Sequence, residues 1–90
     1  MEEIIIGGTY RHFKGGLYTV LAESLYSKDK TTPMITYALL GGQTYTRPKF
    51  DYDGEPGFLT EVDHQKYPEA KQKMRFELVE LPLEVPKLPD

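Results

Sequence analysis

The sequence has no cysteine and no tryptophan, a net charge of only −3 over 90 residues, and no long hydrophobic run. Without cysteine, neither a disulfide framework nor a thiolate metal site can form. No apolar stretch approaches the ~20 residues that a membrane-spanning helix needs, and Glu2-Glu3 has the wrong charge for the start of a signal peptide. These absences predict a soluble cytoplasmic protein that does not associate with membranes.

The small net charge is unevenly distributed along the chain. Residues 1–50 contain six Lys and Arg against four Asp and Glu, whereas residues 51–90 contain five against ten. Either these charges simply cover the surface, or a mildly basic N-terminal face is balanced by an acidic C-terminal half. Neither half is basic enough to indicate sequence-independent binding of nucleic acid, which normally goes with a basic domain.

What the chain does have is aromatic and β-branched residues in short alternating runs, separated by Gly, Pro and Asp. The alternation predicts strands over residues 9–13, 17–27, 34–40, 44–47 and 74–80. Residues 58–62 fit either a short strand or a helical turn, and Pro68 suits the first position of a short helical turn near residues 63–72. We therefore expect one all-β domain over residues 1–90, a small barrel or roll of five to six short strands, with the barrel over about 8–80 and a proline-rich tail over 81–90.

The apolar positions of these strands predict one small core. We expect it to contain the following residues: Phe13, Leu17, Val20, Leu21, Ile35, Leu39, Phe58, Phe76 and Leu78. Ile4-Ile5-Ile6 is too apolar to remain in water, so we expect it to cover the barrel or to pair with a second chain as a homodimer contact.

The hexapeptide Tyr10-Arg11-His12-Phe13-Lys14-Gly15 is the most distinctive motif. Together with the later Arg47-Pro48 pair and the strand that contains Arg75-Phe76-Glu77, it resembles a small bacterial family catalogued as a domain of unknown function, over roughly residues 8–62. The resemblance implies an SH3-like barrel. It implies no established activity.

His12 is the strongest candidate for chemistry, because the unperturbed pKa of an imidazole lies nearest to neutrality. A general base also needs an orienting partner, and no carboxylate has a spacing that places it beside His12. The alternative is a histidine that only hydrogen-bonds a backbone group across the barrel. His64 has no motif around it, and two distant histidines without cysteine give no metal signature.

A second group of candidates is cationic. If the first and fourth strands approach each other, Arg11 and Arg47 would flank a notch that binds a small anion, with Lys14 at its rim. The alternative for Arg47 is an ion pair with an acidic residue of the C-terminal half.

Tyrosines on the predicted strands form the third group: Tyr10, Tyr18, Tyr37 and Tyr45. Aromatic side chains on small barrels bind extended peptides or stack on bases, although strand tyrosines are more often half-buried packing residues with a solvated hydroxyl. The glycine pairs read as hairpin turns rather than a phosphate-binding loop, and no serine lies in a nucleophile elbow.

These observations favour a non-catalytic binding module without cofactor or metal. Its ligand would be a peptide, a nucleic-acid segment or a small anion, and the binding residues would be Tyr10, Arg11, His12, Lys14, Tyr18, Tyr37 and Arg47. One alternative is a small enzyme or enzyme accessory domain that uses His12 as acid-base with Arg11 or Arg47. Another is a structural or assembly domain.

Overall fold

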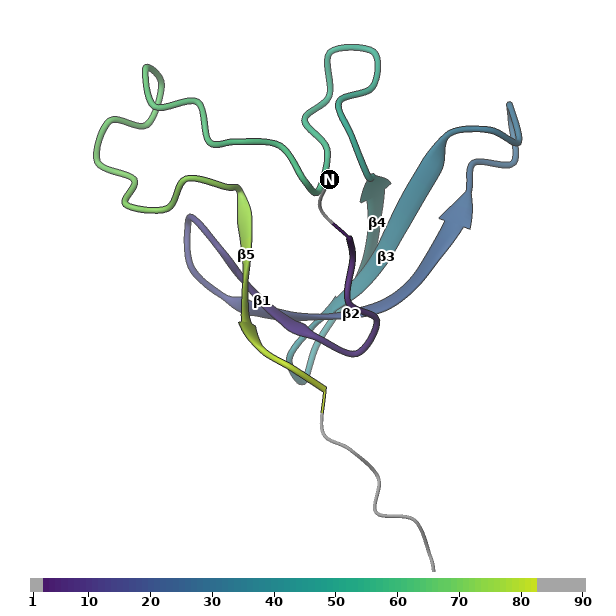
Figure 1. Cartoon of the computed structure of the whole chain (residues 1–90), viewed down its shortest axis with the longest axis horizontal. Coiled ribbons are helices and arrows are strands. Elements are labelled where there is room, and N and C mark those ends of the chain that lie inside the picture. Colours follow the sequence, from purple (N-terminus) through teal and green to yellow (C-terminus); the bar gives the residue numbers. More distant parts are fainter. Residues whose placement is uncertain (1–2, 83–90) are drawn as a thin grey trace, which may run out of the picture.

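The computed structural model describes residues 3–82 and consists of one antiparallel sheet with one long connection (Figure 1). Its strands are β1 (Thr9–His12), β2 (Leu17–Leu25), β3 (Pro33–Leu39), β4 (Thr44–Pro48) and β5 (Phe76–Glu80). All five strands predicted from alternation are therefore confirmed, with ends that differ by at most two residues. Residues 83–90 of the predicted tail lie outside the described residues.

Tight turns join the first four strands into a meander, and the last strand returns to the first. The strand order is β4-β3-β2-β1-β5, and His12 pairs with Phe76 across the final ladder. Gly15 and Gly16 form the turn between β1 and β2 with φ angles of 107° and 91°, which a residue with a Cβ adopts only at a cost. This topology leaves β4 and β5 as the two edges of the sheet.

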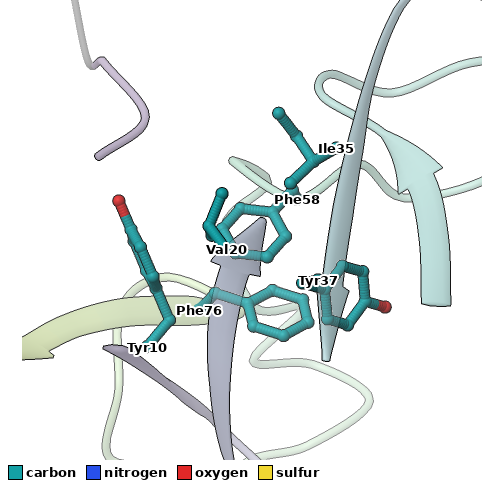
Figure 2. Packing of buried hydrophobic residues seen from close by; sticks show 6 residues of the cluster. All are labelled: Tyr10, Val20, Ile35, Tyr37, Phe58 and Phe76. Atoms are coloured by element: carbon teal, nitrogen blue, oxygen red, sulfur yellow. The ribbon is translucent and has the colours of Figure 1, made fainter. Parts of the chain in front are cut away.

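Six residues form the hydrophobic core on the inner face of the curved sheet (Figure 2): Tyr10, Val20, Ile35, Tyr37, Phe58 and Phe76. The rings of Phe58 and Phe76 are stacked, with centroids 4.2 Å apart and planes 9° apart. Phe58 comes from the connection between β4 and β5, so this stack attaches the connection to the sheet.

The core differs in part from the predicted one. Val20, Ile35, Phe58 and Phe76 are buried as predicted, whereas Tyr10 and Tyr37 were not expected there. The predicted burial of Leu21 and Leu78 was wrong, because these residues are 48% and 41% exposed. An irregularity in the pairing between Val20 and Ala22 changes the alternation at Leu21, and Leu78 lies on an edge strand. Phe13, Leu17 and Leu39 are half-buried.

The sheet is open, so the closed SH3-like barrel expected from the sequence is not confirmed. No ladder joins β4 to β5. Instead the connecting segment, residues 49–75, crosses the gap with single hydrogen bonds: the Phe58 N–H donates to the Pro48 carbonyl at 2.8 Å, and the Arg75 N–H donates to the Thr60 carbonyl at 2.9 Å. An irregular segment takes the place of direct pairing between the edges.

Gly57 allows this segment to approach itself closely. A Cβ at this position would lie 2.3 Å from the carbonyl carbon of Phe50, well inside van der Waals contact. The Gly57 N–H donates to the Thr60 hydroxyl at 2.8 Å, directly before buried Phe58. Only glycine fits here, because of the close approach rather than because of its φ angle.

The helical turn predicted near residues 63–72 is not formed, and residues 3–82 contain no helix. The Tyr67 N–H donates to the Asp63 carbonyl at 2.9 Å, but the next bond, from Ala70 to Tyr67, already spans only three residues. Asp63 also accepts the Gln65 N–H on its side chain, which stabilises a turn in place of a helix. Within the described part of the chain, no helix has the length and apolarity needed to span a membrane.

The N-terminal segment packs against the sheet, as expected for part of Ile4-Ile5-Ile6. Ile4 contacts the core cluster and the Ile5 N–H donates to the Tyr10 hydroxyl at 3.0 Å, whereas Ile6 is exposed. The Gly7 N–H donates to the Val20 carbonyl, which continues the line of β1 beside β2. The homodimer contact predicted for this segment stays a prediction.

Candidate functional site

The inner face of the sheet brings together four of the seven residues predicted to bind a ligand: His12, Tyr18, Tyr37 and Arg47. The ring of Tyr18 lies 6.3 Å from that of His12 and 5.4 Å from that of Tyr37, measured between centroids. The Arg47 Nε donates to the Tyr37 hydroxyl at 2.9 Å. Paired residues on neighbouring strands share a face, so the register places these side chains on the side of the core.

Two further predicted residues are placed differently: Tyr10 lies on the same inner face but within the core, and Arg11 lies on the outer face. Tyr10 is buried, and its ring packs edge-on against Phe58 with centroids 5.1 Å apart. Arg11 alternates with Tyr10 and His12 along β1, so its exposed side chain belongs to the outer face. Strands β1 and β4 are separated by β2 and β3, and the structure does not bring Arg11 and Arg47 together.

Arg75, predicted from the sequence only as part of the last strand, occupies the position beside His12 instead. Its guanidinium carbon lies 4.9 Å from the centroid of the Phe13 ring, and its carbonyl accepts the Phe13 N–H at 2.9 Å. Its buried Nε has no hydrogen-bond partner among the described residues. The strand begins one residue later, at Phe76, so alternation along the strand did not reveal the direction of Arg75.

Arg47 is held in place from β4. Its Nη1 lies 3.5 Å from the Pro56 carbonyl oxygen, and its guanidinium carbon lies 5.3 Å from the centroid of the Phe76 ring. Since β4 and β5 are opposite edges of the sheet, this cation–π contact joins the two edges through side chains. We refer to the three residues His12, Arg47 and Arg75 as the inner cationic cluster.

The cationic side chains around His12 influence its pKa. Burial, together with the charges of Arg75, Arg47 and Lys14, lowers the pKa of His12 to about 4. The ring is therefore neutral at pH 7. The Lys14 backbone N–H donates to His12 Nδ1 at 3.1 Å, so the neutral ring carries its proton on Nε2 and is a hydrogen-bond donor there.

The two arginines also influence each other. Burial and the charge of Arg47 both lower the pKa of Arg75. Within residues 3–82 the ion pairs are Lys49–Glu23 and Lys73–Glu61, and neither includes an arginine. The ion pair considered as the alternative for Arg47 is thus not formed in this part of the chain.

The charge of the Asp51 carboxylate influences the pKa of Arg75, but one oxygen of this carboxylate already accepts two hydrogen bonds. It accepts hydrogen bonds from the Thr60 hydroxyl and the Gly57 N–H, which together lower the pKa of Asp51. The negative charge of Asp51 raises the pKa of Arg75, but this effect is smaller than the lowering by burial and by the charge of Arg47. The inner cationic cluster is therefore only partly balanced by acidic groups.

Around this cluster the remaining candidates are aromatic or lie at its rim. Tyr37 is buried, Tyr18 is half-buried and Tyr45 is 42% exposed, with its ring centroid 5.7 Å from that of Tyr37. Lys14 follows β1 in the turn to β2. His64 lies away from the site on the connecting segment, where its Nε2 is 2.9 Å from the Gln72 carbonyl oxygen. No group of three potential metal ligands occurs among the residues described.

Within residues 3–82 no carboxylate is paired with Arg47 or Arg75, and the acceptors that Arg47 does reach, the Tyr37 hydroxyl and the Pro56 carbonyl, are neutral. Two guanidinium groups and the Nε2–H of a neutral imidazole all suit oxygens that carry negative charge. The aromatic rings that hold the guanidinium groups restrict their orientation, which favours recognition over general electrostatic attraction.

The family match agrees with the motif that carries these residues. Residues 8–78 match the model of a family described as a protein of unknown function, DUF1653. No curated protein and no solved structure matches the chain. The match covers most of the chain, including His12, Arg47 and Arg75, and it confirms the resemblance to a family of unknown function. The chain therefore belongs to the DUF1653 family.

Proposed function

We propose that this protein is a non-catalytic binding module that holds an anionic group of its ligand at the inner cationic cluster. The observation that carries this proposal is that Arg47 lies on the Phe76 ring and Arg75 on the Phe13 ring, and both rings pack against His12. Neither arginine is paired with a carboxylate in residues 3–82. Like charges held together in a partly buried place are unfavourable unless an opposite charge joins them. An anion that binds there relieves this repulsion and gains charge-assisted hydrogen bonds.

The fold offers a suitable scaffold for such a module. A meander whose first strand also pairs with the last supports the SH3-like roll that the family resemblance implies, with the connecting segment in place of direct closure. Residues on strands are positioned more rigidly than residues on loops, and His12 and Arg47 both lie on strands. The cytoplasmic location stays a prediction from the sequence.

The surroundings of His12 support binding over acid-base catalysis. Its Nδ1 accepts a backbone N–H, a position where a catalytic histidine is usually oriented by an acceptor such as a carboxylate. Its depressed pKa makes it a weak base near neutral pH. We therefore assign His12 the role of a neutral donor to the anion.

A titration of isotopically labelled protein with inorganic phosphate and with acetate tests this proposal. We expect shifts in the His12 ring and in the Nε–H signals of Arg47 and Arg75, an affinity that falls as salt rises, and a rise in the His12 pKa as the anion binds. Short oligonucleotides and extended peptides extend the same titration to the other ligand classes.

Arg11 provides the matched control. Arg75→Ala and Arg47→Ala should each weaken binding about 10-fold or more, as expected for a lost charge-assisted hydrogen bond. Arg11→Ala removes the same charge from the outer face and should change the affinity less than about 2-fold. Equal losses from Arg11→Ala and Arg75→Ala, in proteins with unchanged amide spectra, would contradict a specific site.

A further inference from the structure

A cavity of about 530 Å³ lies beside the inner cationic cluster, between the turn after β1 and the connecting segment. Its size falls in the range of ~300–1,000 Å³ that is typical of small-molecule sites. The residues that line it are Phe13, Lys14, Tyr67, Glu69, Ala70, Lys71 and Gln72. The cavity is thus built from the family hexapeptide on one side and from the turn-rich part of the connecting segment on the other.

Phe13 connects this cavity to the cluster. The ring of His12 packs on the ring of Phe13 with centroids 4.7 Å apart, and Arg75 contacts the same ring. Lys14 lines the cavity, and its positive charge also lowers the pKa of His12. Phe13 therefore lines the cavity and also contacts two members of the cluster.

The walls combine two aromatic rings with two lysines, Lys14 and Lys71, and one carboxylate, Glu69. Phe13 and Tyr67 meet edge to face with centroids 5.0 Å apart, and the Lys14 Nζ lies 4.7 Å from the Tyr67 ring centroid. A hydrogen bond from Lys14, with the charges of Lys14 and Lys66, lowers the pKa of the Tyr67 hydroxyl. Rings of this kind pack against planar groups, and the lysines favour a negative charge close to such a group.

We infer that the ligand is a phosphate monoester of a ring-bearing small molecule, with its phosphate at Arg47, Arg75 and Lys14 and its ring in the cavity beside Phe13 and Tyr67. This inference rests on the proposed function. A phosphate monoester carries about −1.5 to −2 charges at pH 7, which matches several cations better than the single charge of a carboxylate. A nucleoside monophosphate and phosphotyrosine share this chemistry, and the experiment separates them.

The test compares dissociation constants from the same labelled protein for four probes: inorganic phosphate, adenosine, adenosine 5′-monophosphate and phosphotyrosine. At least one ester should bind ~10-fold or more tightly than inorganic phosphate. Only the ring-bearing esters should shift the amide signals of Tyr67, Ala70 and Gln72 together with those of the cluster. The ester that binds more tightly identifies the source of the phosphate.

Two substitutions separate the ring site from the phosphate site. Ala70→Phe fills the cavity and Tyr67→Ala removes a wall, so each should abolish the advantage of the ester while phosphate binding stays within about 2-fold. Tyr26→Ala, at an exposed tyrosine outside this cavity, is the matched control and should change neither affinity.

The outcomes distinguish this inference from the proposed function. If inorganic phosphate shifts the cluster and neither ester binds more tightly, the ring site is wrong and the anion site stands. The inference is also wrong if Ala70→Phe and Tyr67→Ala leave the ester advantage intact. If no probe shifts His12, Arg47 or Arg75, both proposals fail.

Discussion

The sheet and the connecting segment, residues 49–75, are held in place in different ways. The strands are bonded in continuous ladders, whereas the connecting segment satisfies its backbone groups one at a time, as in the bond from the Gly57 N–H to the Thr60 hydroxyl. Yet Phe58 and Val62 of this segment are as buried as Val20 and Ile35 of the sheet. A segment without regular structure can therefore be an integral part of a small domain when side chains and single bonds fix it.

The largest expected effect comes from Gly57→Ala. The added Cβ would overlap backbone atoms of Phe50, so the two parts of the connecting segment that meet here have to move apart, directly beside buried Phe58. We expect a loss of more than about 4 kcal/mol in the free energy of unfolding, measured by urea denaturation. Gly54→Ala is the control: its Cβ meets no atom within 4 Å, and only its φ of 80° is costly, about 1 kcal/mol. Similar losses at the two positions would mean that the close approach is not needed.

The stack between Phe58 and Phe76 allows a direct comparison of the two regions. Each substitution to alanine should cost ~3–5 kcal/mol, because each empties a site in the same core. If the connecting segment were only loosely attached, Phe58→Ala would cost far less than Phe76→Ala. Phe50→Ala, at an exposed ring of the same segment, should change stability by less than ~0.5 kcal/mol.

His12 should make stability depend on pH between about 6.5 and 4. Its pKa is lowered in the folded state by burial and by Arg75, Arg47 and Lys14, so the unfolded chain binds the proton first as the pH falls. The free energy of unfolding should decrease by about 1–2 kcal/mol across this window, allowing for solvent screening of a half-buried ring, and this contribution should level off below pH 4.

His12→Gln should remove that part of the pH dependence, since the amide does not titrate. The pKa of His12 can be followed separately by NMR of its ring, with a midpoint expected near 4. A midpoint near 6.5 would show that the ring is solvated and that the arginines do not act on it.

The smallest effect concerns the ion pair between the two regions. Lys49 of the connecting segment lies 3.1 Å from the Glu23 carboxylate on β2. Lys49→Ala should cost no more than ~1 kcal/mol, because such pairs gain little at a surface. A coupling energy between Lys49 and Glu23 above this value, measured in a double-mutant cycle with Glu23→Ala, would mean that electrostatics rather than the Phe58 contact attaches the segment.

The two regions also differ in how well the sequence predicted them. Alternation and glycine pairs located all five strands, because both signals are local. Which residues enter the core depends on contacts between residues that are far apart in the sequence. The shift in strand pairing after Val20 exposes Leu21, and Tyr37 is buried by its contacts with Phe58 and Phe76. The side-chain directions in the connecting segment follow no period, which is why Arg75 was not identified as a site residue.

The candidate site was predictable in the same uneven way. His12, Tyr18, Tyr37 and Arg47 were expected to act together from their types and strand positions, and the structure places them on one face. Arg11 was expected beside Arg47 on the condition that the first and fourth strands approach each other on a barrel. Their separation by two intervening strands is a matter of topology, which spacing along the chain does not give.

The pairing of β1 with β5 has a consequence for how the protein is made. Strands β2, β3 and β4 pair with close sequence neighbours and can associate while the chain is still being synthesised, but His12 has to wait for Phe76. Arg75 reaches His12 only at the same late step. Recognition of a ligand and completion of the fold thus become a single event, so an incomplete or proteolytically clipped chain that lacks β5 would have neither.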